Sequence, residues 1–230
     1  MKKLLLLLVL SLGLIGCASL DSLDSIEFSA SPAEAETKKI LALGLTHTEN
    51  LSEARKLKDP TLVSEVVQEL EARNENARIE AEKVAKYAEK VKVSDNNSKF
   101  IGSNISKSKM RGVLSNYDSQ DYFLQGSINN GMIQHQLHLS VKYTSDKLRN
   151  YYSASFSDKS QVDIALISSS AVSCSGSSCD YTEVMELNLS DDFLRSNMEK
   201  GFSIIFNSIK ISNKITVPSD YIKGYLMVAK

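Results

Sequence analysis

The stretch Thr61–Val93 constrains the fold more than any other part of the chain, because it contains neither glycine nor proline. It is rich in Ala, Glu, Lys and Arg, which favour helix. Asp59-Pro60 supplies an N-cap residue followed by a proline suited to the first helical position. A seam with alternating spacings of four and three residues runs through it: Val63, Val67, Leu70, Asn74, Ala77, Ala81, Val84, Ala88 and Val91. The pattern predicts one long amphipathic helix with a coiled-coil period.

This seam has two interpretations. Asn74 falls at an a position, where a buried asparagine can fix the register and oligomeric state of a coiled coil. Against this, a parallel dimer would place Arg73 of one helix opposite Arg78 of the other, which is not a complementary pairing. Val66 and Tyr87 also widen the apolar stripe on one side, as in a helix packed on its own domain. We expect intramolecular packing, with an oligomer through residues 60–93 as the alternative.

After residue 100 the hydrophobic period changes from 3.6 to 2, which is typical of β-strands. Asn130-Gly131 predicts a type I′ turn between two strands, and counting outward from it pairs Ile128 with Ile133, Leu124 with Leu137 and Tyr122 with Leu139. All six residues are apolar and share one face, which supports this register. The predicted strands are Tyr122–Ile128, Met132–Tyr143, Tyr151–Phe156, Gln161–Val172, Tyr181–Leu189, Phe202–Ile211 and Lys214–Val217.

Helices are predicted on both sides of these strands. Ser31-Pro32-Ala33-Glu34 is a capping box that predicts a helix to about Leu43, and a short helix is expected over Asn50–Lys58. Later helices are expected over Asp191–Lys200 and after Pro218. The predicted fold class is therefore α+β: a helical region (32–95) with one long amphipathic helix, then an antiparallel, sandwich-like β-rich domain (100–230) with a short C-terminal helix.

The first seventeen residues carry the parts of a secretory signal: Lys2-Lys3, an apolar block Leu4–Leu12 and small residues before Cys17. Up to Gly16 this apolar stretch is shorter than the ~20 residues of a membrane-spanning helix. Leu14-Ile15-Gly16-Cys17 resembles the lipobox of bacterial lipoproteins. The resemblance implies that residues 1–16 are a cleaved signal peptide, that Cys17 is lipidated, and that residues 17–31 are a tether. Ala18 in place of an aspartate implies the outer membrane, facing the periplasm.

Charge supports attachment through acyl chains. Without Lys2 and Lys3, 25 basic residues face 28 acidic ones, a formal net charge of −3. Nucleic-acid binding favours a concentrated basic stripe, and binding to anionic headgroups favours a polybasic segment. We therefore expect no nucleic acid as partner and a membrane bound only through the N-terminal lipid.

Cys174 and Cys179 remain as an even pair, separated by four residues of Ser and Gly. The bacterial periplasm allows disulfides, so we predict a bond that closes the hairpin between Gln161–Val172 and Tyr181–Leu189. A metal site needs more ligands than two thiolates, and no histidine lies nearby in the sequence. A redox-active pair typically has the closer Cys-x-x-Cys spacing.

The remaining polar residues do not predict an active site. His135 and His138 lie three apart in a strand, so they face opposite sides, and His135 is expected to cover Gly126 in the core. His47 is expected in a solvated turn, residues 106–109 in a solvated basic turn, and Asp191-Asp192 in the first turn of a helix. We therefore expect no metal, no cofactor and no enzyme. The sequence favours a non-catalytic envelope lipoprotein that acts as a structural or protein-interaction module with an envelope protein as partner. The alternative is a module, built on the β domain, that binds a small ligand or glycan.

Overall fold

The computed structural model describes residues 30–96, 98–111 and 116–230. Cys17, the predicted signal peptide and nearly all of the predicted tether lie outside these residues. The chain forms two compact units, one ending at Ala72 and the other running Arg73–Lys230, so the division falls within the long helix.

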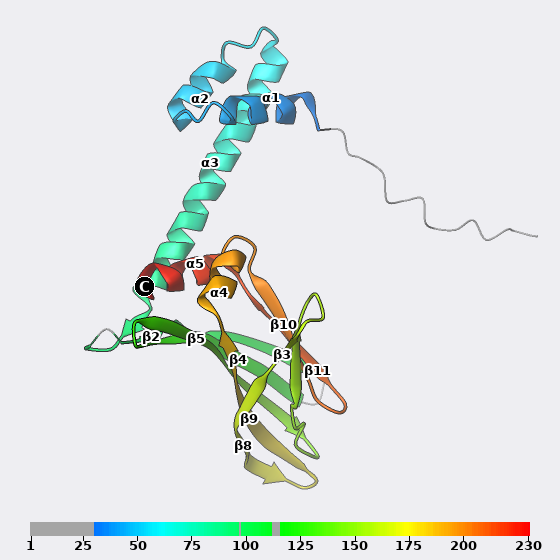
Figure 1. The fold of residues 1–230 in the computed structure, drawn as a ribbon. Helices are drawn as coiled ribbons and strands as arrows, with labels where there is room; N and C mark the ends of the chain where they lie inside the picture. Colours follow the sequence, from blue (N-terminus) through cyan, green and yellow to red (C-terminus); the bar gives the residue numbers. More distant parts are fainter. Residues whose placement is uncertain (1–29, 97, 112–115) are drawn as a thin grey trace, which may run out of the picture. The chain divides into compact units, whose positions relative to one another are not determined.

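Helices precede antiparallel strands, which confirms the predicted α+β class. The helices are α1 (Pro32–Leu41), α2 (His47–Ala54), α3 (Pro60–Glu89), α4 (Asp191–Asn197) and α5 (Ser219–Val228). The strands are β1 (Lys92–Val93), β2 (Lys99–Ile101), β3 (Ile105–Arg111), β4 (Asn116–Asn129), β5 (Met132–Ser145), β6 (Ser153–Phe156), β7 (Gln161–Val162), β8 (Ile164–Ser175), β9 (Ser178–Leu189), β10 (Phe202–Asn207) and β11 (Ser212–Val217) (Figure 1).

The first unit packs α1 and α2 against the start of α3. The Ser31 side chain accepts a hydrogen bond from the Glu34 backbone, as the predicted cap requires. Thr46 and Glu49 form a second, reciprocal capping box, so α2 begins at His47 and not near Asn50; the sequence prediction overlooked this cap. The core of this unit consists of Ala33, Ile40, Ala54, Val66 and Leu70.

In the second unit the strands form two antiparallel sheets. The large sheet has the order β1-β2-β4-β5-β9-β8, with β3 also paired to β4, and the small sheet has the order β11-β10-β6-β7. The predicted hairpin register is confirmed, including Ile128 opposite Ile133 and Leu124 opposite Leu137. Asn130 and Gly131 both have positive φ angles, 52° and 76°, as a type I′ turn requires.

Other predicted segments also differ. The strand predicted over 202–211 ends at Asn207. The strand predicted over 161–172 is split at Asp163: Gln161-Val162 joins β6 in the small sheet, whereas Ile164 onward joins β9 in the large sheet. Residues 106–109 are not a turn but part of β3, because their backbone completes a ladder with β4. The long helix ends at Glu89 and not at Val93, because Lys92-Val93 pairs with β2.

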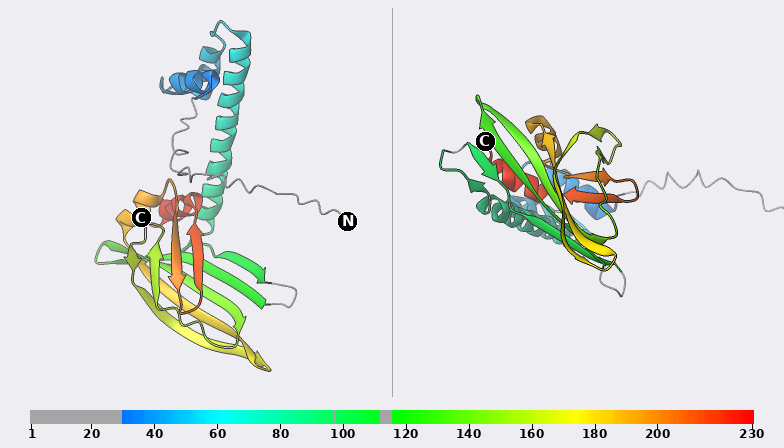
Figure 2. Two further views of the ribbon diagram at one scale, coloured as in Figure 1. Left: turned by 90° about the vertical axis from the view of Figure 1, so that its right-hand side faces the viewer. Right: turned by 90° about the horizontal axis from the view of Figure 1, so that it is seen from below.

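The two sheets share one hydrophobic core, and α4 and α5 pack against it (Figure 2). The Tyr122 hydroxyl donates to the Thr216 carbonyl across 2.6 Å, linking β4 to β11. The Tyr221 hydroxyl of α5 accepts from the Leu124 backbone at 2.8 Å. The last turns of α3 also belong to this unit, with the Tyr87 and Tyr221 rings in edge contact at 5.1 Å. Within the described residues, no helix is both long and apolar enough to cross a bilayer.

Candidate functional site

The seam of α3 is buried only in part. Val63 and Val67 are half-buried and Leu70 is buried within the first unit. A Cβ atom built on Gly224 of α5 would lie only 2.6 Å from the Val84 carbonyl, so α5 approaches α3 closely there. The intervening seam residues Asn74, Ala77 and Ala81 are exposed. Intramolecular packing thus accounts for the ends of the predicted seam, and an oligomer through its middle stays a prediction.

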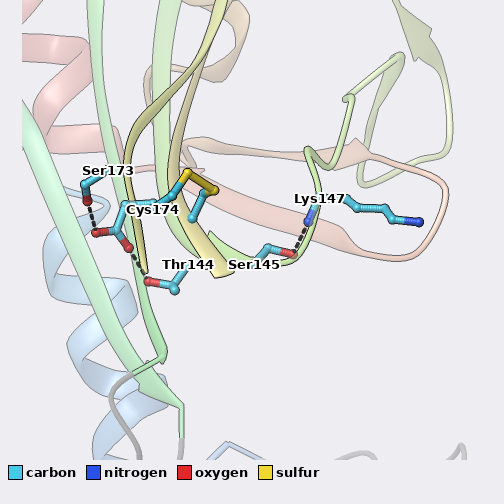
Figure 3. The surroundings of a disulfide bond; sticks show 7 residues. Thr144, Ser145, Lys147, Ser173 and Cys174 are labelled. Atoms are coloured by element: carbon cyan, nitrogen blue, oxygen red, sulfur yellow. Dashed lines mark hydrogen bonds between the residues drawn. A yellow bond between two sulfur atoms is a disulfide. The ribbon is translucent and has the colours of Figure 1, made fainter. Parts of the chain in front are cut away.

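The predicted disulfide is present. Cys174 and Cys179 are joined across the tip of the β8–β9 hairpin, with sulfur atoms 2.01 Å apart (Figure 3). Beside it, the Asp180 carboxylate accepts from Thr144 of β5 at 2.6 Å and from Ser173 of β8 at 2.9 Å. These hydrogen bonds hold the pKa of Asp180 below its usual value. The tip of the hairpin is therefore held by the disulfide and by the hydrogen bonds that the Asp180 carboxylate of β9 accepts from β5 and β8.

The disulfide-closed hairpin forms one margin of the large sheet, where β8 is an edge strand paired only with β9 (Figures 1 and 2). β8 is twelve residues long and contains no charged residue, glycine or proline. Register shifts relative to β9 skip Ile167 and Val172, which are 53% and 69% exposed. β8 is therefore a long, uncharged edge whose exposed apolar side chains are Ile167, Val172 and also Leu166, which is 46% exposed.

Edge strands commonly carry charges or are kept short, which discourages pairing with other chains. The other edges in the described part of the chain follow this rule. β1 and β7 have two residues each. β3 presents exposed Lys107 and β11 presents exposed Lys214. Apart from its two register shifts, β8 has none of these protections.

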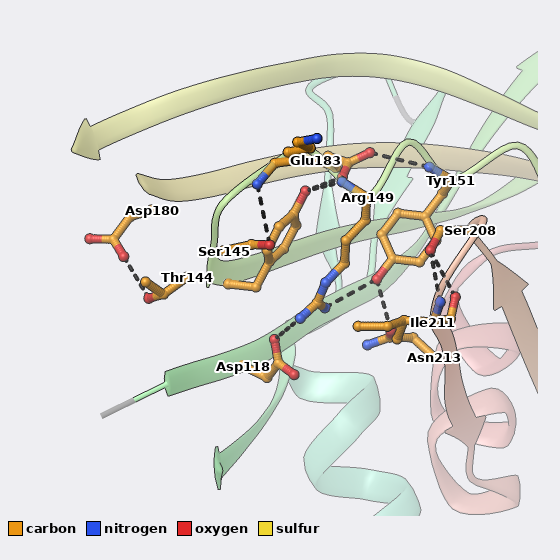
Figure 4. A network of polar contacts seen from close by, with 12 residues as sticks. Asp118, Thr144, Ser145, Arg149, Tyr151, Asp180, Glu183, Ser208, Ile211 and Asn213 are labelled. Atoms are coloured by element: carbon orange, nitrogen blue, oxygen red, sulfur yellow. Dashed lines mark hydrogen bonds and ion pairs between the residues drawn. The ribbon is translucent and has the colours of Figure 1, made fainter. Parts of the chain in front are cut away.

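A buried polar network lies further along β9, where Glu183 is 0% exposed (Figure 4). Its carboxylate accepts hydrogen bonds from the Tyr143 hydroxyl and from the backbone amides of Arg149, Asn150 and Tyr151. Burial, followed by the bond to Glu183, raises the pKa of the Tyr143 hydroxyl above its usual value. Glu183 thus fixes the segment that leads from the large sheet to the small one.

The network continues through the Arg149 side chain. Its guanidinium lies 3.9 Å from the Tyr143 ring centroid, donates to Asp118 at 2.6 Å and donates to the Tyr151 hydroxyl at 3.3 Å. Tyr151 in turn donates to Asn213 of β11 at 2.7 Å. The sequence interpretation missed these residues. One signal was available: Glu183 shares the inward face of its strand with Met185 and Leu187, where an acid is unexpected.

His135 lies opposite Gly126 in the core, as predicted. Its Nδ1 lies 3.0 Å from the Tyr225 hydroxyl, and its Nε2 lies 3.2 Å from Asp191. Burial lowers the pKa of His135 more than the hydrogen bond to Asp191 raises it. Asp191 lies in the first turn of α4, as predicted, and pairs with Arg195 at 2.6 Å.

The remaining surface includes an open cleft of about 650 Å³ beside the small sheet. Phe156, Phe193 and Phe202 line it and contact one another, with ring centroids 4.6 to 6.2 Å apart. Asp158 and Lys200 also line the cleft. Because the three rings pack on one another, we assign them to the edge of the hydrophobic core.

Within residues 30–96, 98–111 and 116–230, no group of three or more His, Cys, Asp or Glu side chains is arranged to hold a metal ion. His47, expected in a solvated turn, lies in α2 with its Nε2 3.2 Å from Glu71. Comparison with models of protein families gives no match, and neither a curated protein nor a solved structure is significantly similar to the chain. A functional proposal therefore depends on the geometry of the molecule.

Proposed function

We propose that the protein is a non-catalytic lipoprotein of the bacterial envelope, anchored through Cys17, and that it acts as a structural module by pairing β8 with β8 of a second copy. The single observation that carries this proposal is the open side of β8, an uncharged strand of twelve residues. Unpaired backbone amides and carbonyls along an edge are a template for another strand.

A second copy suits this edge because of its charge. Like charges placed opposite each other on paired strands are destabilising, and β8 brings none to an antiparallel pairing with itself. Exposed Ile167 and Val172 also gain apolar burial when another strand covers the edge. The register shifts at these residues confine regular pairing to short stretches such as Ser168–Ala171, which favours a reversible contact over a fibril.

Anchoring supports the same arrangement. More than one acyl chain gives stable membrane attachment, and attached copies share one surface at a raised effective concentration. With a lipid at Cys17, even a weak edge contact then joins neighbouring copies. The resemblance to bacterial lipoproteins implies that this surface is the periplasmic face of the outer membrane.

Sedimentation velocity of the mature protein in detergent, over a concentration series, tests the pairing. We expect a monomer–dimer equilibrium that Val172→Lys shifts to monomer. Ile209→Lys is the matched control, since Ile209 is 82% exposed in the turn between β10 and β11. A protein that stays monomeric at every concentration refutes self-pairing. A dimer that survives Val172→Lys but is lost in Ala77→Lys belongs instead to the α3 seam.

Anchoring has its own test. Cys17→Ala is expected to release the protein from the membrane fraction of fractionated cells. A Cys17→Ala variant that stays membrane-bound contradicts the lipid anchor without affecting the pairing result.

A further inference from the structure

A groove of about 340 Å³ opens over β4 and β5, on the face opposite the core. Its walls come from Lys90 and Lys92, after α3 and in β1, and from residues 101–104 at the end of β2 and directly after it. The volume lies within the range of pockets that hold small molecules. All of its residues belong to the second unit, and none lies on β8, so the groove is independent of the pairing edge.

Two stacked rings provide the apolar part of this groove. Phe123 of β4 and His138 of β5 lie directly opposite each other, with ring centroids 4.6 Å apart and planes 24° from parallel. His138 Nδ1 lies 3.1 Å from the Glu186 carboxylate, which fixes the orientation of the imidazole. Both rings remain partly exposed on the sheet surface. Aromatic surfaces of this kind contact the C–H faces of flat, amphipathic ligands.

Neutral polar groups lie beside the rings. Ser103, Asn104 and Ser140 all line the groove. The Ser103 hydroxyl oxygen is buried and has no hydrogen-bond partner within the described part of the chain. Buried hydroxyls are normally paired, and a turn of the Ser103 side chain toward the groove would let a bound ligand supply the missing partner.

The charge of the groove is positive. Lys90 and Lys92 line it, are exposed, and make no ion pair with any described residue. The carboxylate that also lines it, Asp121, is already occupied: it accepts from Ser106 at 2.5 Å and pairs with Lys142 at 3.3 Å. An anionic group is therefore favoured next to the two lysines.

We propose that this groove binds an anionic sugar. The sugar ring would lie against Phe123 and His138, its hydroxyls would bond Ser103 and Ser140, and its carboxylate or phosphate would face Lys90 and Lys92. An aliphatic acid would leave the neutral polar groups unused, and a neutral sugar would leave the lysines without a counter-charge.

Isothermal titration of the mature protein with D-glucuronate, D-glucose 6-phosphate, D-glucose and acetate tests this. One or both of the anionic sugars should bind, with glucose and acetate each at least about tenfold weaker, because each lacks one of the recognised parts. Lys92→Gln and Ser103→Ala should each weaken the anionic sugar about fivefold or more, as expected for a lost charge-assisted or neutral hydrogen bond. The matched control Lys210→Gln, an exposed lysine between β10 and β11, should leave binding unchanged.

The proposal would be overturned if neither anionic sugar showed saturable binding. It would also be overturned if glucose or acetate bound as tightly as the anionic sugars. An equal loss of affinity in Lys210→Gln would show general attraction to positive charge and no site. Circular dichroism of each variant separates lost binding from lost folding.

Discussion

The Arg149 guanidinium donates to the Asp118 carboxylate across 2.6 Å, and the two side chains are only 8% and 9% exposed. This pair links β4 to the segment that crosses between the sheets. Two ions removed from water are stabilised only while both are present, because the loss of one leaves the other uncompensated.

Replacing Arg149 by alanine should therefore lower the free energy of unfolding by about 3–5 kcal/mol, the range for breaking a buried pair. Urea denaturation followed by circular dichroism measures this. Lys147→Ala, an exposed lysine of the same segment, is the control and should change stability little. The double variant Arg149→Met with Asp118→Asn should recover part of the loss, because neither member of the pair then leaves its partner's charge buried alone. A loss below 1 kcal/mol in Arg149→Ala, within the usual range for surface substitutions, would contradict this assignment.

Gly126→Ala should destabilise the protein, because a Cβ atom there would collide with the Tyr225 hydroxyl and lie 3.1 Å from His135 Nδ1. The expected loss is about 1–3 kcal/mol, as for other overpacked cores. Removing the hydroxyl with Tyr225→Phe makes room, so the double variant should lose less than the sum of the two single variants. Thermal unfolding of the four proteins measures this coupling. Strict additivity would show that the close approach is not the cause.

Stability should fall as the pH drops below about 6.5, the ordinary pKa of histidine, because His135 has a lowered pKa in the folded state. In this range the unfolded chain binds a proton that the folded chain rejects, so acidification favours unfolding. The slope contributed by one proton reaches up to about 1.4 kcal/mol per pH unit. Urea titrations between about pH 7 and pH 5 should show a flatter dependence in His135→Gln; the carboxylates titrate mainly lower. An unchanged slope would contradict the assignment.

Loss of the disulfide should have a modest effect. Cys174 and Cys179 are only five positions apart, and the loop-entropy relation gives about 2 kcal/mol for so short a loop. Cys174→Ser with Cys179→Ser should lower the unfolding free energy by no more than this, since the core lies elsewhere. Reduction of the disulfide in the native protein should lower the melting temperature by the same amount as the double substitution does. A collapse of the whole fold would show that the bond does more than close the hairpin tip.

Local patterns made the β4–β5 hairpin predictable. Its turn residues require positive φ angles, and the alternating apolar residues on either side allow a single register that buries them. The cap at Ser31 was equally local, because its side chain accepts a hydrogen bond from the backbone amide of Glu34, three residues later. By contrast, the break of the predicted strand at Asp163 has only a weak local signal: aspartate is depleted in strands, but the residues on both sides favour extended backbone.

The sequence by itself determined the α+β class, the register of the central hairpin and the pairing of Cys174 with Cys179, because each follows from residues close together in the chain. The tertiary structure decided that β8 is an open edge and that Asp118, Arg149 and Glu183 belong to one buried network. It also decided that Phe123 and His138 line the same groove as Lys90 and Lys92. The physical reason is that edges, buried polar contacts and grooves arise where distant segments pair, and the pairing partners are not encoded in the neighbouring residues.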